Sequence, residues 1–431
     1  MRLFTVVREH QRQFAPHGGV HRIGNDDFAG LRHALQPGSN VESLLSIARE
    51  GNPDFASMRY EADAAAERIT PAGALPDPKL RTELMDITKG GSQSASLSPS
   101  RVGSTRYTLM QDIPWFGKRD LKREIAELEA EGAKGRAYGT WSEVATKIKT
   151  IYAQLYYLSR NESLTREILD LMVRLEKIAQ VRYAGGLAAQ QDVIRAQVEQ
   201  TSMRNELIAL ETEHHHLMTR MNALLGRSVN SPLAMPEALR PLPAPAKLDY
   251  PALEERARAR NPMLSAEEHR IKAAEKSRDL AYKNRYPDLT VGVVPNQMQN
   301  EVKQWDLMFE INIPLQQSSR RAQEREAEAM VSASRAKRDG TSNQLLADLS
   351  ANLSELEAAR RTERLTTDSL LPQAELTMKA ALAGYETGKV DFATLLDAQR
   401  QIRQAKLNQI KSRAEAQVRL AEIERILGED L

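Results

Sequence analysis

The strongest constraint on the fold is that this chain of 431 residues repeats one plan twice. Short landmarks recur in the same order at a near-constant spacing: Asn-Pro at Asn52 and Asn261, then Ile-Pro at Ile113 and Ile313. "YAGGLAAQQDVIRAQ" is later matched by "YETGKVDFATLLDAQ", and a Leu-Gly pair follows each of the two. Such ordered self-similarity predicts a tandem duplication of one structural unit.

The landmarks divide the chain into four parts. A poorly ordered leader is expected first, and a proline-rich, non-helical linker is expected to join the two repeats. The expected parts are the leader, the first repeat, the linker and the second repeat, at residues 1–40, 41–230, 231–248 and 249–431.

Each repeat predicts the same series of elements. A helix follows the Asn-Pro pair, because proline is tolerated in a first turn. Two short strands joined by a polar loop follow, within residues of about 78–113 and 287–313, with the loops at 89–100 and 295–303. Long helices then occupy residues 116–226 and 315–428, each interrupted by one tight glycine turn. The glycine of each closing Leu-Gly is a natural helix stop.

The long helices carry the spacing of helices packed side by side. Val144, Ile148 and Ile151 begin a 4-3-4-3 series, and leucines from Leu346 to Leu356 repeat it in the second half. The segment from Phe116 to Arg182 would extend about 100 Å as a helix. That length predicts an extended shaft.

Composition excludes several classes of function. The chain has no cysteine, so disulfides, thiolate catalysis, thiolate zinc sites and a lipidated cysteine are excluded. Its 60 basic and 58 acidic residues give no electrostatic case for a nucleic-acid partner. No run approaches the roughly 20 apolar residues of a transmembrane helix. The apolar run Leu3–Val7 is short for a signal peptide, so either the protein is not exported or this start is not the natural one for export.

The strands alternate between an apolar and a polar face. In "QWDLMFEINIPL" the apolar side carries Trp305, Leu307, Phe309, Ile311 and Ile313, and the other side carries Asp306, Glu310 and Asn312. This alternation is typical of transmembrane barrel strands, although a soluble hairpin packed on a helix would show it too. Four strands cannot close a barrel alone, and open edges are not viable in lipid, so a barrel would need several chains.

The duplicated helix–hairpin–helix–turn–helix plan, the "YxxG" turn and the "LDAQ" helix resemble the TolC-type outer-membrane efflux channels, over residues of about 41 to 431. "DIPWFGKRDLK" and "WDLMFEINIPL" are most similar to the subgroup that serves heavy-metal cation pumps of the resistance-nodulation-division type. The resemblance implies a mainly α-helical chain forming an α-barrel tunnel, with four strands per chain completing a twelve-stranded trimeric barrel. Its implied partners are two further copies of the chain, outer-membrane lipid, a periplasmic adaptor protein and an inner-membrane pump. It also implies a location in the bacterial outer membrane with a periplasmic extension.

The resemblance also implies functional positions. The tip turns that would meet the adaptor are Gly185-Gly186-Leu187 and Gly388-Lys389-Val390, although glycine is needed there for the chain reversal alone. The tunnel gate would involve Asp397, Asp192 and Thr394. Thr394 stands one turn before Asp397, at a position where TolC has an acid, so it would not add a second ring of carboxylates to the gate. Solvated aspartates on a helix surface remain the alternative reading.

No catalytic or cofactor motif is recognised. The three histidines His214, His215 and His216 point about 100° apart on a helix, and His214 with Met218 lacks further ligands, so no metal site is predicted. The resemblance therefore implies a passive, gated conduit for heavy-metal cations. A drug-efflux or type I secretion channel and a soluble coiled-coil scaffold remain the alternatives.

Overall fold

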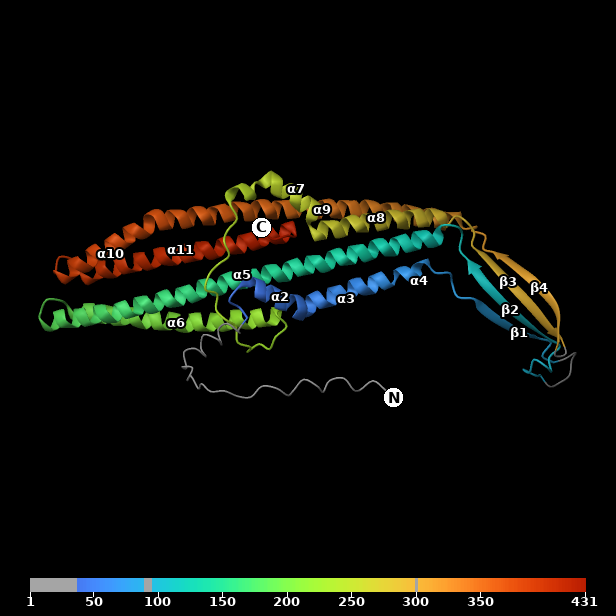
Figure 1. Ribbon diagram of the computed structural model, residues 1–431, viewed down its shortest axis with the longest axis horizontal. Coiled ribbons are helices and arrows are strands. Elements are labelled where there is room, and N and C mark those ends of the chain that lie inside the picture. The colour runs from blue at the N-terminus through green and yellow to red at the C-terminus, as the bar shows by residue number, and fades with distance from the viewer. Residues whose placement is uncertain (1–36, 89–94, 299–300) are drawn as a thin grey trace, which may run out of the picture.

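The computed structural model describes residues 37–88, 95–298 and 301–431, so most of the expected leader lies outside the described residues. The chain forms a long helical shaft (Figure 1). At one end two tight turns each join a pair of helices, and at the other end lies a β-sheet. The prediction of a mainly α-helical chain with four strands is confirmed.

The first repeat begins with short helices and ends with two long ones. Its elements are α2 (Val41–Gly51), α3 (Pro53–Glu67), α4 (Ile69–Gly73), β1 (Lys79–Met85), β2 (Ser104–Ile113), α5 (Lys118–Ala184) and α6 (Gln190–Leu224). Asn52 caps α3 by accepting a hydrogen bond from the Phe55 amide, directly before Pro53. The sequence did not predict α2 as a separate helix before this cap.

The second repeat follows the same order. After the 3₁₀ turn η1 (Pro245–Leu248) come α7 (Tyr250–Arg260), α8 (Pro262–Lys283), β3 (Leu289–Met298), β4 (Glu301–Ile311), α9 (Gln317–Leu365), η2 (Thr366–Leu370), α10 (Leu371–Glu386) and α11 (Phe392–Leu427). Asn261 caps α8 as Asn52 caps α3, with its side chain accepting from the Met263 and Leu264 amides. The two repeats thus share their capping chemistry as well as their order.

The second repeat corrects one prediction. Its long helix is not continuous, because η2 inserts a π-helical turn between α9 and α10, with the Leu371 amide bonded to the Thr366 carbonyl. The next residue, Pro372, has no amide hydrogen and its ring would collide with the carbonyl four residues earlier. Widening the helix locally accommodates the proline.

The four strands form one antiparallel sheet in the order β1-β2-β3-β4. The polar loop expected at 295–303 is wrong, since β3 continues to Met298 and β4 begins at Glu301. Asn296 belongs to the strand because its side chain bridges Arg106 and Asp306 on the neighbouring strands. Ile313 lies two residues beyond β4, outside the expected strand face.

The 67 residues of α5 form the backbone of the shaft. In its half near the sheet, small buried residues let α8 approach closely: a Cβ at Gly135 would lie 3.0 Å from the Ala266 Cβ. In its other half, larger side chains such as Leu155, Met172 and Leu175 are fully buried. The expected coiled-coil spacing therefore describes the half of α5 that leads to the turns, where α6 and α11 pack against it.

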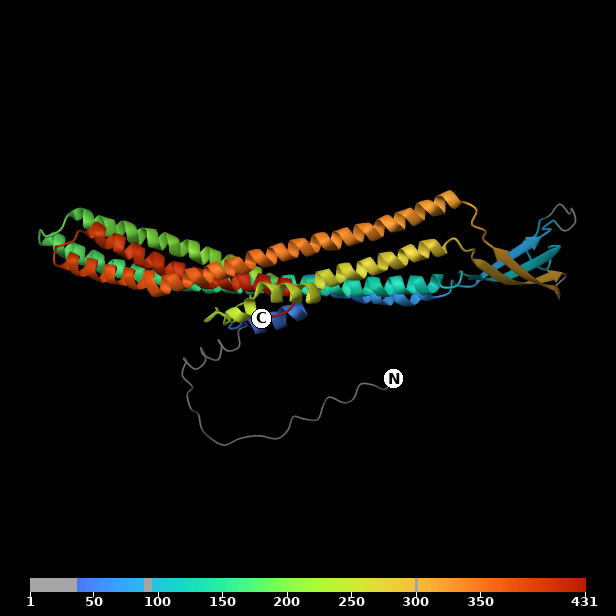
Figure 2. The same ribbon diagram turned by 90° about the horizontal axis from the view of Figure 1, so that it is seen from above.

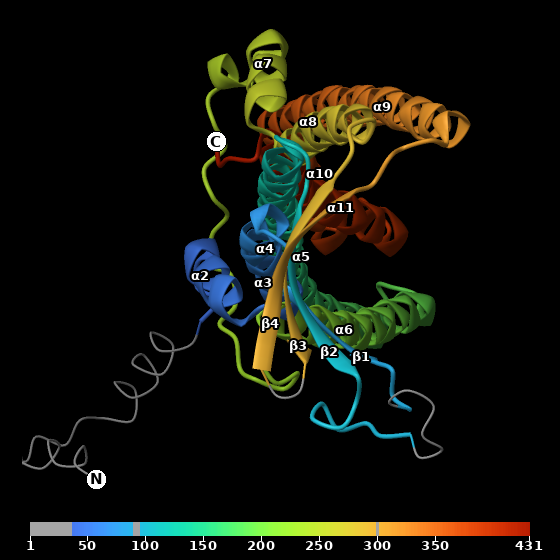
Figure 3. The ribbon, with the colours of Figure 1, turned by 90° about the vertical axis from the view of Figure 1, so that its right-hand side faces the viewer.

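The shorter helices α2 and α7 lie outside the long helices near the middle of the shaft (Figure 2, Figure 3). The linker between the repeats crosses the shaft at this level and is fixed there. Tyr152 of α5 donates its hydroxyl toward the Ala238 carbonyl, and Gln417 of α11 donates to the Arg240 carbonyl. The linker is therefore an ordered part of the fold.

Candidate functional site

The two tip turns have the same backbone geometry. After α5, the Leu187 amide donates to the Arg182 carbonyl and the Gly186 amide donates to the Tyr183 carbonyl. After α10, Lys389 and Gly388 make the equivalent bonds to Gly384 and Tyr385. Gly186 and Gly388 both have a positive φ, of 69° and 75°. Both turns are thus Schellman motifs whose reversal requires glycine.

One arginine joins the two turns. Arg182, in the last turn of α5, donates to the Glu386 carbonyl of the other turn at 2.8 Å and to its own turn at Leu187. Its guanidinium lies 4.9 Å from the centre of the Tyr385 ring. Arg182 therefore links the helix pair of the first repeat to that of the second.

The residues around this link are partly desolvated. Tyr385 is only 2% exposed and packs against Phe392, and its hydroxyl has no hydrogen-bond partner among the described residues. Burial, followed by the negative charge of Asp192, raises the pKa of the Tyr385 hydroxyl. Burial also raises the pKa of Asp192, with nearby Asp391 acting in the same direction and two arginines opposing it. A carboxylate, an arginine and a buried tyrosine thus meet where the two helix pairs join.

The structure places the three predicted gate residues in different surroundings. Asp192 is half-buried beside this link, whereas Asp397 is exposed and lies 4.0 Å from the Arg400 guanidinium. Thr394 acts in helix capping, since both its amide and its hydroxyl donate to the carboxylate of Asp391, the N-cap of α11.

Sequence reasoning missed Arg182, Tyr385 and Asp391. The signals available were the Tyr of the "YxxG" pattern and the Asp three residues before Thr394, which is the spacing of a helix cap. The interaction of Arg182 with Tyr385 joins residues from different repeats, so no local pattern could have found it.

At the other end of the shaft, one sheet face is apolar and exposed. A row of directly paired side chains crosses all four strands, formed by Leu80, Leu109, Val293 and Leu307. Beside it on β4 lie Trp305, Phe309 and Ile311, and the exposed fraction of these seven side chains runs from 40% to 74%. Exposed apolar patches of this kind mark a contact surface.

The opposite face carries polar side chains that bond across strands. Lys79 forms an ion pair with Asp112 at 2.7 Å, and Thr290 donates to the same carboxylate. Arg106, Asn296 and Asp306 form a second chain of contacts. The strand order leaves the outer edges of β1 and β4 without partners in the described chain, and such edges require pairing with another strand or protection.

Two further features are absent from the described residues. None of the helices in residues 37–88, 95–298 and 301–431 is long and apolar enough to span a membrane. The same part of the chain contains no group of three or more His, Asp or Glu side chains arranged to hold a metal ion.

Comparison with known proteins identifies the family. Cobalt-zinc-cadmium resistance protein CzcC of Cupriavidus metallidurans is 24% identical over 392 residues, covering 90% of each chain. Among solved structures, CusC matches with a TM-score of 0.78 and 18% identity, covering 90% of this chain and 92% of that one. The outer membrane protein VceC of Vibrio cholerae matches with a TM-score of 0.76 and 19% identity, covering 90% and 96%. The family described as outer membrane efflux protein matches residues 44–227 and 253–429. Because these two segments span most of both repeats, the chain belongs to the outer membrane efflux protein family.

Proposed function

We propose that three copies of this chain form an outer-membrane channel that passes heavy-metal cations from an inner-membrane pump to the exterior. The observation that carries the membrane assignment is the exposed apolar row across all four strands, on a sheet with two open edges. Three such sheets, joined edge to edge, would close a barrel of twelve strands with the apolar face toward lipid and the polar face toward the pore.

The helical shaft supplies the conduit. The 67 residues of α5 span about 100 Å, which suits a tunnel that reaches from the outer membrane into the periplasm. The proposed role is passive, and the energy for export would come from the partner pump.

The gate is proposed at the tip end of this tunnel. Asp192 and Asp397 from three copies would bring like charges near the axis, where carboxylates repel each other and attract cations. Thr394 would support this region through its bonds to Asp391. Arg182 would keep the tunnel narrow by holding the two helix pairs together.

The tip turns are the proposed contact with a periplasmic adaptor. Gly185, Gly186 and Leu187 are exposed on the first turn, and Gly388 and Lys389 are exposed on the second. Val390 packs inward, because a Cβ at Gly384 would lie 2.5 Å from its Cγ2 atom. Leu187 and Lys389 would therefore make the direct side-chain contacts, and Val390 would support the shape of the turn.

The name of CzcC supports metal cations as the substrate class. Deleting the gene should lower tolerance to zinc, cobalt or cadmium and leave drug tolerance unchanged. Loss of drug tolerance alone would favour a drug-efflux channel and refute the metal assignment.

The membrane assignment is tested separately, with protein expressed from its native gene. Cells are fractionated, and the mass of the detergent-solubilised protein is measured by light scattering. A trimer in the outer-membrane fraction is expected. A soluble monomer or dimer in the cytoplasm would refute the channel and favour a scaffold.

A further inference from the structure

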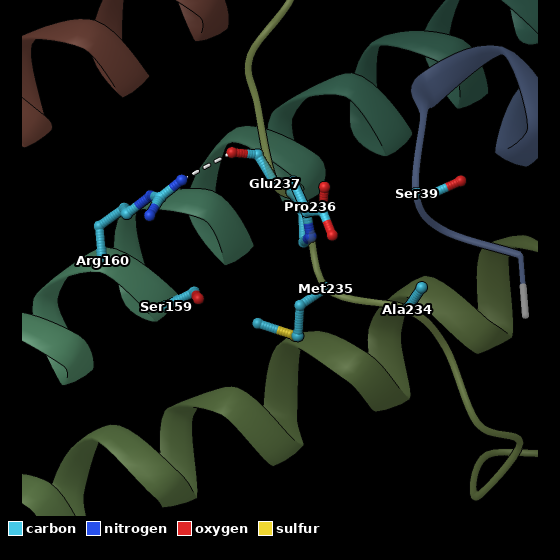
Figure 4. Close-up of a pocket in the computed structure, with 7 residues that line it drawn as sticks. All are labelled: Ser39, Ser159, Arg160, Ala234, Met235, Pro236 and Glu237. Atoms are coloured by element: carbon cyan, nitrogen blue, oxygen red, sulfur yellow. Dashed lines mark hydrogen bonds between the residues drawn. The ribbon is translucent and has the colours of Figure 1, made fainter. Parts of the chain in front are cut away.

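The linker between the repeats forms one wall of a hollow of about 200 Å³ at the middle of the shaft. Ser159 and Arg160 of α5 form another wall, and the linker contributes residues 234–237 (Figure 4). Figure 4 shows the side chain of Met235 lying over α6 and extending toward the α5 residues Ser159 and Arg160. The hollow lies far from both the tips and the sheet.

The linker holds Met235 in a defined position. The Ala234 amide donates to the Pro37 carbonyl at 3.0 Å, and Arg160 donates to the Glu237 carbonyl at 2.7 Å. Asn222 of α6 donates to the Ser231 carbonyl. Hydrogen bonds on both sides of Met235 therefore fix its backbone over α6, as a preorganised site requires.

A histidine of α6 meets this methionine. The His214 Nε2 atom lies 2.9 Å from the Met235 sulfur, although the two residues belong to different elements. Met218 stands one helical turn after His214, on the same side of α6, and packs on the same hydrophobic core as Met235. From the sequence alone, His214 and Met218 lack a further ligand, and Met235 meets them only because the linker folds back over α6.

Imidazole and thioether are neutral donors, and thioethers select soft metal ions. The hollow also contains the opposite charges of Arg160 and Glu237, so it offers no excess negative charge to a divalent ion. We propose that His214, Met235 and Met218 bind one soft monovalent cation, Ag⁺ or Cu⁺, at the middle of the shaft. This site is independent of what the tunnel conducts.

Binding requires a small movement. At the bond lengths of zinc, about 2.0 Å to an imidazole nitrogen and about 2.3 Å to a thiolate sulfur, the two donor atoms of a tetrahedral site lie roughly 3.5 Å or more apart, and Ag⁺ is a larger ion. The His214 and Met235 donor atoms must therefore separate by about half an ångström or more. Methionine is unbranched and flexible, so its sulfur can move while the linker backbone stays in place.

The test uses full-length protein in detergent, without a polyhistidine tag and in chloride-free buffer. The protein carries ¹³C-labelled methionine methyl groups and is titrated with Ag⁺, which has no redox chemistry under these conditions. We expect the Met235 and Met218 signals to shift and saturate at one Ag⁺ per chain. Met235→Leu and His214→Gln should each weaken Ag⁺ binding at least tenfold, measured by calorimetry.

Two variants serve as matched controls. Met330→Leu removes an exposed thioether on α9, and His216→Gln removes an exposed imidazole on α6, so both should bind Ag⁺ as the unmodified chain does. Zn²⁺ at the same concentration should leave the Met235 signal unchanged. Unaltered Ag⁺ affinity in Met235→Leu, or an equal loss in the two controls, would overturn the proposal. The methyl spectrum of each variant shows whether it is folded, and Met218→Leu provides a further variant that alters only α6.

Discussion

Replacing Lys149 by methionine removes one charge from a buried ion cluster and keeps most of the side-chain volume. The Lys149 ammonium donates to the Glu424 carboxylate at 2.7 Å and contacts Asp430. The side chains of Lys149 and Glu424 are only 5% and 3% exposed. Arg240 of the linker donates to both oxygens of Glu424, at 3.1 and 3.0 Å. The cluster thus joins α5, α11 and the linker.

The destabilisation expected for Lys149→Met depends on the partners that Glu424 keeps. Removing one partner of a buried ion pair costs about 3–5 kcal/mol when the other charge is left unpaired. Glu424 would still have Arg240 and the Leu431 amide, at 3.2 Å. We therefore expect Lys149→Met to lower the free energy of local opening by about 2–3 kcal/mol, which is less than the loss for a fully unpaired charge. At 1.4 kcal/mol per factor of ten, this raises the equilibrium constant for opening about 30- to 150-fold.

The suitable assay is native-state hydrogen exchange at the end of α11. The Gly428 amide donates to the Glu424 carbonyl, so its exchange reports the opening of the last helical turn. Lys149→Met should speed exchange there by the factor given above. Lys147→Met, which removes an exposed lysine one half-turn away, should change it less than about threefold.

A combined variant separates electrostatics from packing. In Lys149→Met with Arg240→Met and Glu424→Leu, no charge of the buried group is left without a partner, so exchange should be slower than in Lys149→Met alone. Unchanged exchange in the single variant would refute the reasoning, and so would a combined variant that opens more easily than the single one.

Three further predictions concern the sheet and the tips. Leu307→Lys puts a charge on the apolar sheet face at a cost of about 2–4 kcal/mol in lipid and should reduce trimer yield in the outer membrane, whereas Glu310→Lys on the opposite face should not; equal yields would contradict the assignment of faces. Gly388→Ala should speed amide hydrogen exchange at the tips more than Gly186→Ala does. Both substitutions place an alanine at a positive φ, but only a Cβ at position 388 lies 3.3 Å from the Arg182 guanidinium. The reverse order would count against the role of Arg182 in joining the two turns. Burial raises the pKa of Asp192, so the stabilisation from its neutral form is complete below the unfolded pKa and is lost as the pH rises through the raised folded value. Asp192→Asn should therefore slow exchange in the first turn of α6 at pH 7 and weaken its pH dependence; faster exchange would show that the charged form is the favoured one.

The local parts of the fold were predictable because they follow from local periodicity. Strict alternation places Leu307 and Phe309 on one face whatever the partner strand, and the 3-4 spacing identifies the long helix α5. The extension of β3 was missed because Asn296 looks like a loop residue. It is satisfied in the strand by Arg106, which is distant in sequence.

The candidate sites depend still more on distant contacts. The link between Arg182 and the second tip joins the two repeats, and Met235 reaches His214 only because the linker is fixed across the shaft. Pro372 lies within the segment predicted as one long helix, and the helix accommodates this proline by widening one turn.

The two tip turns share one backbone geometry but are followed by different side chains. The position of Asp192 in the first repeat is that of Thr394 in the second, and Arg195 likewise corresponds to Asp397. A ring of six separate, identical half-chains would repeat each side chain six times around the axis. Fusing two halves into one chain instead allows two kinds of side chain to alternate, three of each. In the proposed trimer, acid and base at these levels would therefore follow a threefold pattern, while the helices that carry them keep nearly sixfold spacing.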